Sequence, residues 1–234
     1  MPLFSQAEFH ATVANLAALP DDSVAEAAFA GRSNAGKSSA INALAGRSRL
    51  AFVSKLPGRT QHLNYFRVAD GRYWVDLPGY GFARAPAEIR EQWEGLLAPY
   101  LMGRAPLAGL MLIMDARHPL TELDLQMIDW FARTGKPIHV LLSKADKLSR
   151  NEQARVLREV RAALAGRAGI FSVQLFSSLK RAGIEEAENV LASWLGLTPG
   201  ETPPAPATPA PPAKPPRPRK RSAQGWSARN SGKK

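Results

Sequence analysis

The sequence predicts an α/β domain in which helices cover both faces of a mainly parallel sheet, the doubly wound arrangement. Short apolar segments of β-type composition alternate with longer segments of helical periodicity, the pattern of strand–helix–strand units. Two of the apolar segments are separated only by Ala69-Asp70-Gly71, too short for a parallel crossover, so these two should form an antiparallel hairpin. With 234 residues, 45% of them hydrophobic, the chain can bury a core of ordinary size.

Six strands and five helices are expected from these patterns. The expected strands are Ala25–Ala30, His62–Val68, Arg72–Asp76, Gly109–Asp115, Pro137–Ser143 and Phe171–Phe176. The expected helices are Lys37–Leu44, Ala87–Leu101, Glu122–Thr134, Arg150–Ala165 and Ile184–Trp194. Ser149-x-x-Glu152 is a capping box at a helix start, and Thr121-x-x-Asp124 resembles one with Asp in place of Glu. The sheet should therefore hold five parallel strands and one antiparallel strand.

The basic residues are concentrated at the C-terminal end. The net charge is +11, and residues 201–234 hold eight Lys or Arg, one acidic residue and nine of the nineteen prolines. Such a segment has little to bury and repels itself, so we expect a disordered Pro/Lys/Arg-rich tail suited to a polyanion. Residues 1–24 are expected to pack on the domain, residues 25–198 to form it, and residues 199–234 to be the tail.

Composition and hydropathy exclude several classes of protein. The chain has no cysteine, which excludes disulfides and thiolate metal sites. Its longest apolar run, Leu107 to Met114, is far shorter than the roughly 20 residues of a membrane-spanning helix. The N-terminal residues lack the basic and apolar regions of a secretory signal. We expect a cytoplasmic monomer without a membrane span.

The first motif is a phosphate-binding loop. Gly31-Arg32-Ser33-Asn34-Ala35-Gly36-Lys37-Ser38 fits the pattern G-x-x-x-x-G-K-[ST], follows an expected strand and opens an expected helix. Glycines allow backbone N–H groups to surround phosphate oxygens, and the helix N-terminus adds its positive end. Lys37 would reach the β- and γ-phosphates, and Ser38 would supply a hydroxyl oxygen to Mg²⁺. The alternative is a glycine-rich turn that only caps a helix.

Two later segments are candidates for the metal side of the site. Asp76-Leu77-Pro78-Gly79 ends a strand, where an Asp can hold Mg²⁺ through water and the Gly N–H can meet the γ-phosphate. Pro57-Gly58-Arg59-Thr60-Gln61 lies between the first helix and the second strand, where GTPases carry a mobile switch. Thr60 would give Mg²⁺ a second hydroxyl. Each segment alone would be an ordinary turn or loop, and only its position argues for function.

Two further segments indicate which base is bound. Ser143-Lys144-Ala145-Asp146 follows an apolar strand and should lie on the same sheet edge as the phosphate loop. An ionised Asp146 offers two acceptors to the N1–H and N2–H₂ donors of guanine, whereas adenine presents an acceptor at N1. Phe176-Ser177-Ser178 follows the last strand, where GTPases place backbone N–H groups against the guanine O6. Together with the phosphate loop, these segments predict guanine-nucleotide binding.

The segments occur in the order found along GTPase chains, and their residues resemble those of the EngB family. The resemblance covers roughly residues 5–197 and rests on Phe29–Ser39, Pro57–Gln61, Asp76–Gly81, Arg117–Thr121, Lys144–Leu148 and Phe176–Lys180. It implies a TRAFAC-class P-loop GTPase that binds the maturing large ribosomal subunit in the bacterial cytoplasm. It also implies GTP contacts at Gly31–Ser38, Gly58–His62, Asp76–Gly79, Ser143–Asp146 and Phe176–Ser178, with Mg²⁺ on Ser38 and Thr60. His62 departs from the residues usual at its place.

The catalytic candidates are Lys37, Asn34 and Thr60. Ras-like GTPases orient the attacking water with a Gln directly after the Asp-x-x-Gly segment, and this chain has Tyr80 there, so we expect slow hydrolysis. Two interpretations of Asn34 remain open. Its side chain can help to hold a K⁺ ion that offsets developing charge at the phosphates, or it can simply stabilise the turn of the loop.

Two other functions remain as alternatives. The protein could be a GTP-dependent RNA–protein scaffold in which hydrolysis is incidental. It could also be a cell-division or membrane-associated GTPase, similar to septins or dynamins. The chain lacks the long helical stalk, the coiled-coil heptads and the amphipathic helix that this second alternative needs.

Overall fold

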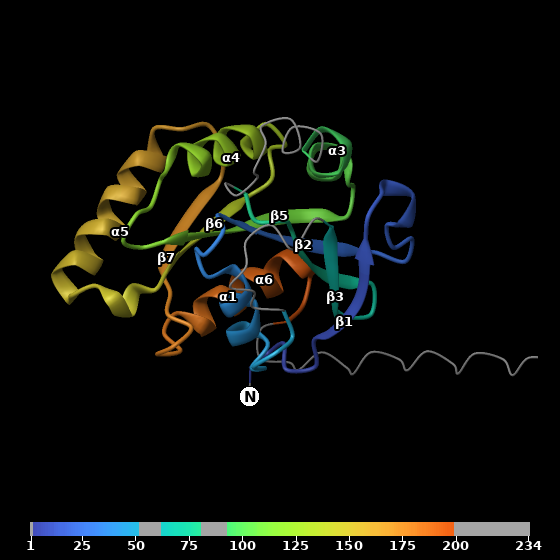
Figure 1. The fold of residues 1–234 in the computed structure, drawn as a ribbon, viewed down its shortest axis with the longest axis horizontal. Coiled ribbons are helices and arrows are strands. Elements are labelled where there is room, and N and C mark those ends of the chain that lie inside the picture. The colour runs from blue at the N-terminus through green and yellow to red at the C-terminus, as the bar shows by residue number, and fades with distance from the viewer. Residues whose placement is uncertain (1, 52–61, 81–92, 199–234) are drawn as a thin grey trace, which may run out of the picture.

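A computed structural model shows a twisted sheet between two layers of helices (Figure 1). It describes residues 2–51, 62–80 and 93–198. Over these residues the sheet has seven strands in the order β1-β3-β4-β2-β5-β6-β7. The strands are β1 (Glu8–Val13), β2 (Ala25–Gly31), β3 (Leu63–Ala69), β4 (Arg72–Asp76), β5 (Leu107–Asp115), β6 (Ile138–Ser143) and β7 (Phe171–Leu175).

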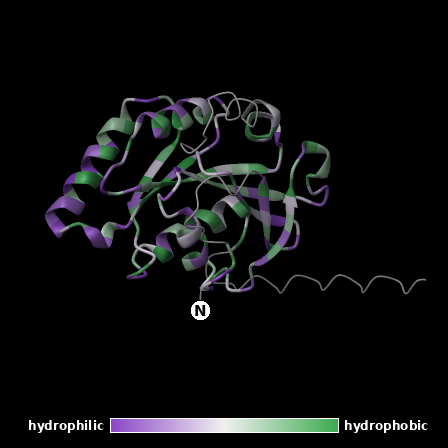
Figure 2. Ribbon diagram, in the orientation of Figure 1, coloured by the Kyte–Doolittle hydropathy of each residue, from purple (hydrophilic) through white to green (hydrophobic). Residues whose placement is uncertain are grey.

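The helices divide between the two faces of the sheet. They are α1 (Lys37–Leu44), α3 (Ala98–Gly103), α4 (Glu122–Ala132), α5 (Arg150–Ala165) and α6 (Ile184–Leu195), and a π-helical turn, Trp93–Leu97, precedes α3. Apolar residues of α3, α4 and α5 fill one core on one face, and those of α1 and α6 fill a second core on the other (Figure 1). Figure 2 shows the same division, with apolar residues on the helix sides that face the sheet. The predicted doubly wound class is confirmed.

The strand that the sequence did not predict is β1. Six strands were expected, but Glu8–Val13 adds a seventh at the sheet edge, where it pairs antiparallel with β3. Only one of its six residues is fully buried, because an edge strand has a single neighbour and here shows much of its surface to solvent. Its sequence, Glu-Phe-His-Ala-Thr-Val, therefore lacks a clear apolar pattern. β3 runs antiparallel to β4, as the hairpin prediction required, and also to β1.

Helix ends follow the capping signals closely. In α5 the Ser149 N–H donates to Glu152 Oε2 over 2.8 Å, and the Glu152 N–H donates to Ser149 Oγ over 3.4 Å. In α4 the Asp124 carboxylate accepts from the Thr121 N–H over 3.0 Å. These side chains satisfy N–H groups that have no partner within a helix. Part of the expected helix Ala87–Leu101 lies outside the described residues. Among the described helices, none is both long and apolar enough to cross a bilayer.

A buried carboxylate joins the sheet to the segment around α3. Glu26 of β2 is fully buried and accepts from the Tyr100 hydroxyl over 2.8 Å and from the Tyr65 hydroxyl over 3.2 Å. Arg104, just after α3, donates two hydrogen bonds to Glu26 Oε1, over 2.9 and 2.7 Å. Burial of the phenol, and then the nearby Glu26 charge, raise the pKa of Tyr100 well above its usual value. The charge of Glu26 is thus fully paired inside the protein.

Removing Glu26 should strongly destabilise the fold. Glu26→Ala leaves Arg104 without its anion and two buried hydroxyls without an acceptor, so we expect a loss of about 3–5 kcal/mol in the free energy of unfolding. Urea denaturation measures this loss. The control is Glu8→Ala, which removes an ion pair with Arg67 whose Glu8 side chain is 44% exposed and should cost about 1 kcal/mol or less. Similar losses in the two variants would contradict the role given to Glu26.

Candidate functional site

The loop between β2 and α1 makes a tight turn with two residues in the left-handed conformation. Gly31 is the last residue of β2 and Lys37 the first of α1. Gly36 has φ 104° and Asn34 has φ 65°, both in the left-handed region that Gly tolerates best and Asn next best. A Cβ on Gly31 would lie 2.7 Å from the Ile113 carbonyl oxygen of β5. Gly31 therefore lets the loop pack against β5, and Gly36 lets it turn into α1.

A buried ion pair connects this loop to the end of β4. The Lys37 Nζ donates to Asp76 Oδ1, and only 8% of Lys37 and 4% of Asp76 is exposed. The chain after Asp76 also lies along the loop, since the Ser33 N–H donates to the Tyr80 carbonyl over 3.0 Å. A Cβ on Gly79 would approach Ser33 Oγ to 3.3 Å. Asp76–Gly79 and the phosphate loop are thus in direct contact.

The segment after β6 is bonded to the carbonyl oxygens of the same loop. Ser143 Oγ donates to the Ala35 carbonyl, and Lys144 Nζ donates to the Asn34 carbonyl over 2.6 Å. Lys144 has φ 57°, a left-handed conformation that is uncommon for a residue with a side chain. Two residues of the Ser143–Asp146 segment therefore hold the phosphate loop from a strand that is not its neighbour in the sheet.

The carboxylate of Asp146 is oriented by the segment after β7. Ser177 Oγ donates to Asp146 Oδ1 over 2.5 Å, and the Ala145 N–H donates to the Phe176 carbonyl over 3.1 Å. Lys147 Nζ lies 3.9 Å from the other oxygen, Asp146 Oδ2. The Asp146 side chain is only 9% exposed. Phe176 and Ser177 thus lie beside Asp146, with Ser178 next in the chain.

Two acidic residues that the sequence did not predict as parts of the site support these segments. Asp115, at the end of β5, accepts from Lys144 Nζ over 3.0 Å and from Arg117 Nη2 over 2.6 Å. Burial raises the pKa of Asp115, but the hydrogen bonds from Arg117 and Lys144 outweigh it and hold the pKa well below its usual value. Its position at the carboxyl end of a parallel strand was the one available signal.

The second is Asp124, at the start of α4, which holds the residue after Gly79. The Tyr80 hydroxyl donates to Asp124 Oδ1 over 2.7 Å, and both residues are buried. Burial, followed by the Asp124 charge, raises the pKa of Tyr80 far above its usual value. The Tyr80 hydroxyl is therefore neutral, and its proton is donated to Asp124 in a hydrogen bond.

The structure brings together most of the predicted site residues that it describes. Gly31–Ser38, Asp76–Gly79, Ser143–Asp146 and Phe176–Ser178 meet at the edge of the sheet where β2, β4, β6 and β7 have their carboxyl ends. His62 lies exposed just before β3. No hydrogen bond or ion pair joins it to these segments within the described part of the chain. Gly58, Arg59, Thr60 and Gln61 lie outside the described residues.

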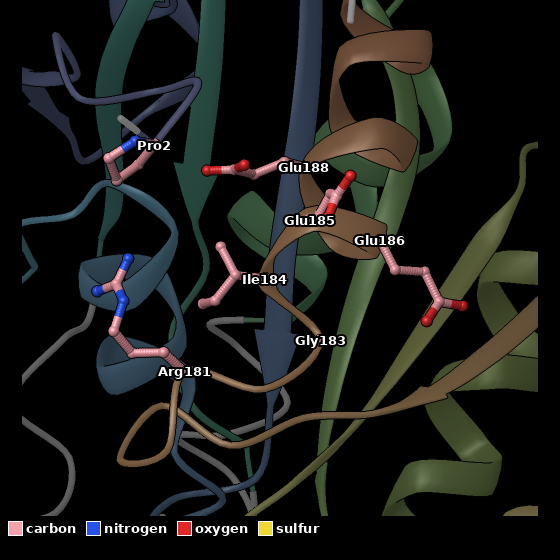
Figure 3. A pocket seen from close by; sticks show the side chains of 7 residues that line it. All are labelled: Pro2, Arg181, Gly183, Ile184, Glu185, Glu186 and Glu188. Atoms are coloured by element: carbon pink, nitrogen blue, oxygen red, sulfur yellow. The ribbon is translucent and has the colours of Figure 1, made fainter. Parts of the chain in front are cut away.

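A hollow elsewhere on the surface is not part of this site. It has a volume of about 590 Å³, lies at the N-terminal end of α6, and is lined by Pro2, Arg181, Gly183, Ile184, Glu185, Glu186 and Glu188. In Figure 3 the Glu188 side chain points toward Pro2, and that of Glu186 points away from it. Three glutamates and one arginine would repel the phosphates of a nucleotide. No predicted site residue lines the hollow.

Comparison with known proteins decides the family. A relative named probable GTP-binding protein EngB, from Dechloromonas aromatica (strain RCB), is 68% identical over 199 residues, which cover 84% of this chain and 90% of the relative. The chain belongs to the EngB family of GTP-binding proteins. An EngB relative from Aromatoleum aromaticum is 60% identical over 206 residues, covering 88% of this chain and 95% of the relative. A family model described as 50S ribosome-binding GTPase matches residues 26–144.

Solved structures agree with the fold. The crystal structure of a probable GTP-binding protein engB matches with a TM-score of 0.58 and 22% identity, covering 74% of this chain and 99% of that one. A bacterial selenocysteine-specific elongation factor matches with a TM-score of 0.54 and 18% identity, covering 74% of this chain and 29% of that one. The predicted family and fold class are confirmed. As an EngB protein, the chain is a GTPase that binds guanine nucleotides.

Base selection should change when Asp146 is replaced. Asp146→Asn keeps one acceptor oxygen but puts an amide donor in place of the other, so GTP should bind about 10² times more weakly or worse. Xanthosine triphosphate should gain affinity, because xanthine has a carbonyl where guanine has its amino group. Titration of both nucleotides into wild type and variant measures the switch. A variant that binds GTP as tightly as wild type does would refute the assignment of Asp146.

Proposed function

We propose that the protein hydrolyses GTP slowly and uses the GTP-bound state to time its binding to the large ribosomal subunit during assembly. The observation that carries this proposal is the match of residues 26–144 to the 50S ribosome-binding GTPase model. The net charge of +11 also suits a partner made largely of RNA.

We assign the nucleotide contacts from the geometry of the described segments. N–H groups of Gly31–Ser38, other than those of Ser33 and Ala35 that already donate to the Tyr80 and Arg32 carbonyls, would surround the phosphates. Lys37 would contact the β- and γ-phosphates. Asp146 would bind N1–H and N2–H₂ of guanine while its Oδ1 keeps the bond from Ser177. The Lys144 stem would lie along the purine, since its Nζ is fixed on the phosphate loop. Backbone N–H groups near Ser178 would meet the guanine O6.

We propose Mg²⁺ as the cofactor, held by Ser38 and Thr60. Among the described residues no group of three or more His, Cys, Asp or Glu could hold a metal ion. Mg²⁺ binds through a few protein oxygens, nucleotide phosphates and water, so the two hydroxyls would suffice as its protein ligands. Ser38 is the second residue of α1, and the residue before it, Lys37, is paired with the buried Asp76 carboxylate. When bound, Mg²⁺ would offset charge on the β- and γ-phosphates.

Slow turnover is proposed from the surroundings of Tyr80. A Gln at this place would orient the attacking water, but the Tyr80 hydroxyl is buried and donates to Asp124. We therefore expect an unaided rate of roughly 10⁻⁴–10⁻³ s⁻¹, comparable with that of Ras. The φ of 65° at Asn34 fits its role in the turn, and a K⁺ ion beside it stays a prediction of the sequence.

Residues 201–234 lie outside the described residues, and their eight basic side chains are proposed to add salt-dependent affinity for RNA. We also propose that the protein is a cytoplasmic monomer, the expectation drawn from its sequence.

Sedimentation with purified large subunits tests the proposal. With a non-hydrolysable GTP analogue the protein should pellet with large subunits at least about tenfold more tightly than with GDP, which corresponds to roughly 1.4 kcal/mol of coupling. Small subunits and lipid vesicles are the controls. Binding to vesicles instead would favour a membrane-associated GTPase. Equal binding with GTP analogue and GDP would favour a scaffold in which hydrolysis is incidental.

A further inference from the structure

One flank of α5 carries a row of arginines that the nucleotide site does not use. All the basic residues of α5 are arginines, and three of them, Arg150, Arg158 and Arg161, fall within about 80° of one another around the helix at 3.6 residues per turn. We call these three residues the arginine stripe. They are exposed and extend over about 16 Å of helix at 1.5 Å per residue.

The stripe borders the open edge of the sheet. Val156, Val160 and Leu164 form the buried side of α5, about 120° around the helix from the middle of the stripe. Arg161 Nη2 donates to the Val173 carbonyl of β7 over 3.1 Å, and β7 is the last strand in the sheet order. α5 and β7 lie together at one end of the molecule in Figure 1, and Figure 2 shows hydrophilic residues on the outer side of α5.

The charges of the stripe have no acidic partner in the described part of the chain. Neither Arg150 nor Arg158 makes an ion pair or a side-chain hydrogen bond there, and Arg161 bonds only a neutral carbonyl. Other arginines do pair with carboxylates, namely Arg67, Arg104, Arg117 and Arg167. On α5 itself, Arg155 lies farther round the helix, within electrostatic reach of Glu152. The three guanidinium groups of the stripe therefore lie in a row with no carboxylate to neutralise them in the described part of the chain.

We propose that the arginine stripe binds the phosphate backbone of structured RNA on the ribosomal subunit. The inference rests on the proposed function and adds a surface to it. Guanidinium groups bind phosphates in a bidentate manner, which the consistent use of Arg on α5 favours. Ala154 and Ala165 are the other residues on this flank, and their small side chains leave room for a ribose–phosphate chain. The Val173 carbonyl holds Arg161 in an orientation that needs little further ordering.

The stripe lies near the base-binding segment but shares no residue with it. Arg150 lies only four residues after Asp146, so RNA bound along α5 would begin close to the base-binding segment. Phosphate contacts of this kind set orientation and carry no base specificity. Double-stranded RNA, which proteins recognise by backbone and shape, is the form that a straight row of cations fits best.

A pair of matched double variants tests the inference in the full-length protein. Arg150→Gln with Arg158→Gln removes two stripe charges, while Arg49→Gln with Arg133→Gln removes two exposed charges outside α5. Binding of each to purified large subunits is measured with a GTP analogue at several KCl concentrations. The stripe variant should bind about tenfold or more weakly, and its salt slope should fall by about 1–2, since each phosphate contact contributes about 0.9. The control variant should resemble wild type, and GDP affinity should be unchanged in both.

The other outcomes separate the two proposals. If wild type binds the subunit and the stripe variant matches the control in affinity and slope, the stripe proposal is overturned and the proposed function stands. Should wild type bind no large subunits in any nucleotide state, the proposed function fails and the stripe proposal falls with it. A second measurement uses a 20-base-pair RNA duplex. A stripe variant that loses the subunit but binds this duplex as wild type does would indicate an acidic protein partner and overturn the choice of RNA.

Discussion

The site depends on how the carbonyl groups of the phosphate loop are satisfied. A loop whose N–H groups converge on phosphates turns its carbonyls outward, where each needs a donor of its own. Ser143 and Lys144 supply two donors, to Ala35 and Asn34. They come from the end of β6, which is separated from β2 by β5. The same two residues precede Asp146, so the bonds that complete the phosphate loop also fix the distance between the phosphates and the base.

Supporting side chains hold the rest of the site in the same way, each from a different strand end or helix start. Asp115 on β5 holds Lys144 with its charge, and Asp124 on α4 holds the hydroxyl of Tyr80. Lys37 and Asp76 pair across the end of β4. All of these contacts lie at one edge because parallel strands put their carboxyl ends together. The opposite end of β2 carries the Glu26 cluster, which ties α3 to the sheet and leaves the site edge to nucleotide chemistry.

The parts predicted from the sequence are those whose signal is local. The bounds of α1 and α5 match the expected ones, because a phosphate-loop motif precedes one helix and a capping box begins the other. The motif segments were also found, since each is a short run at a strand end. β1 was missed because a half-exposed edge strand has no apolar periodicity. Asp115 and Asp124 were missed as parts of the site because their partners, Lys144 and Tyr80, lie 29 and 44 residues away in the sequence.

The affinity of Ser143→Ala for GDP tests most directly whether these bonds build the site. The variant leaves the buried Ala35 carbonyl without its donor, at a cost of about 1–3 kcal/mol. Titration calorimetry should show GDP affinity lowered about tenfold or more. Thr134→Ala is the matched control, because it removes a hydrogen bond to the Phe131 carbonyl at the end of α4, worth about 1 kcal/mol and away from the nucleotide site, and it should leave GDP affinity unchanged. Unchanged affinity in Ser143→Ala, or an equal loss in both variants, would contradict the account.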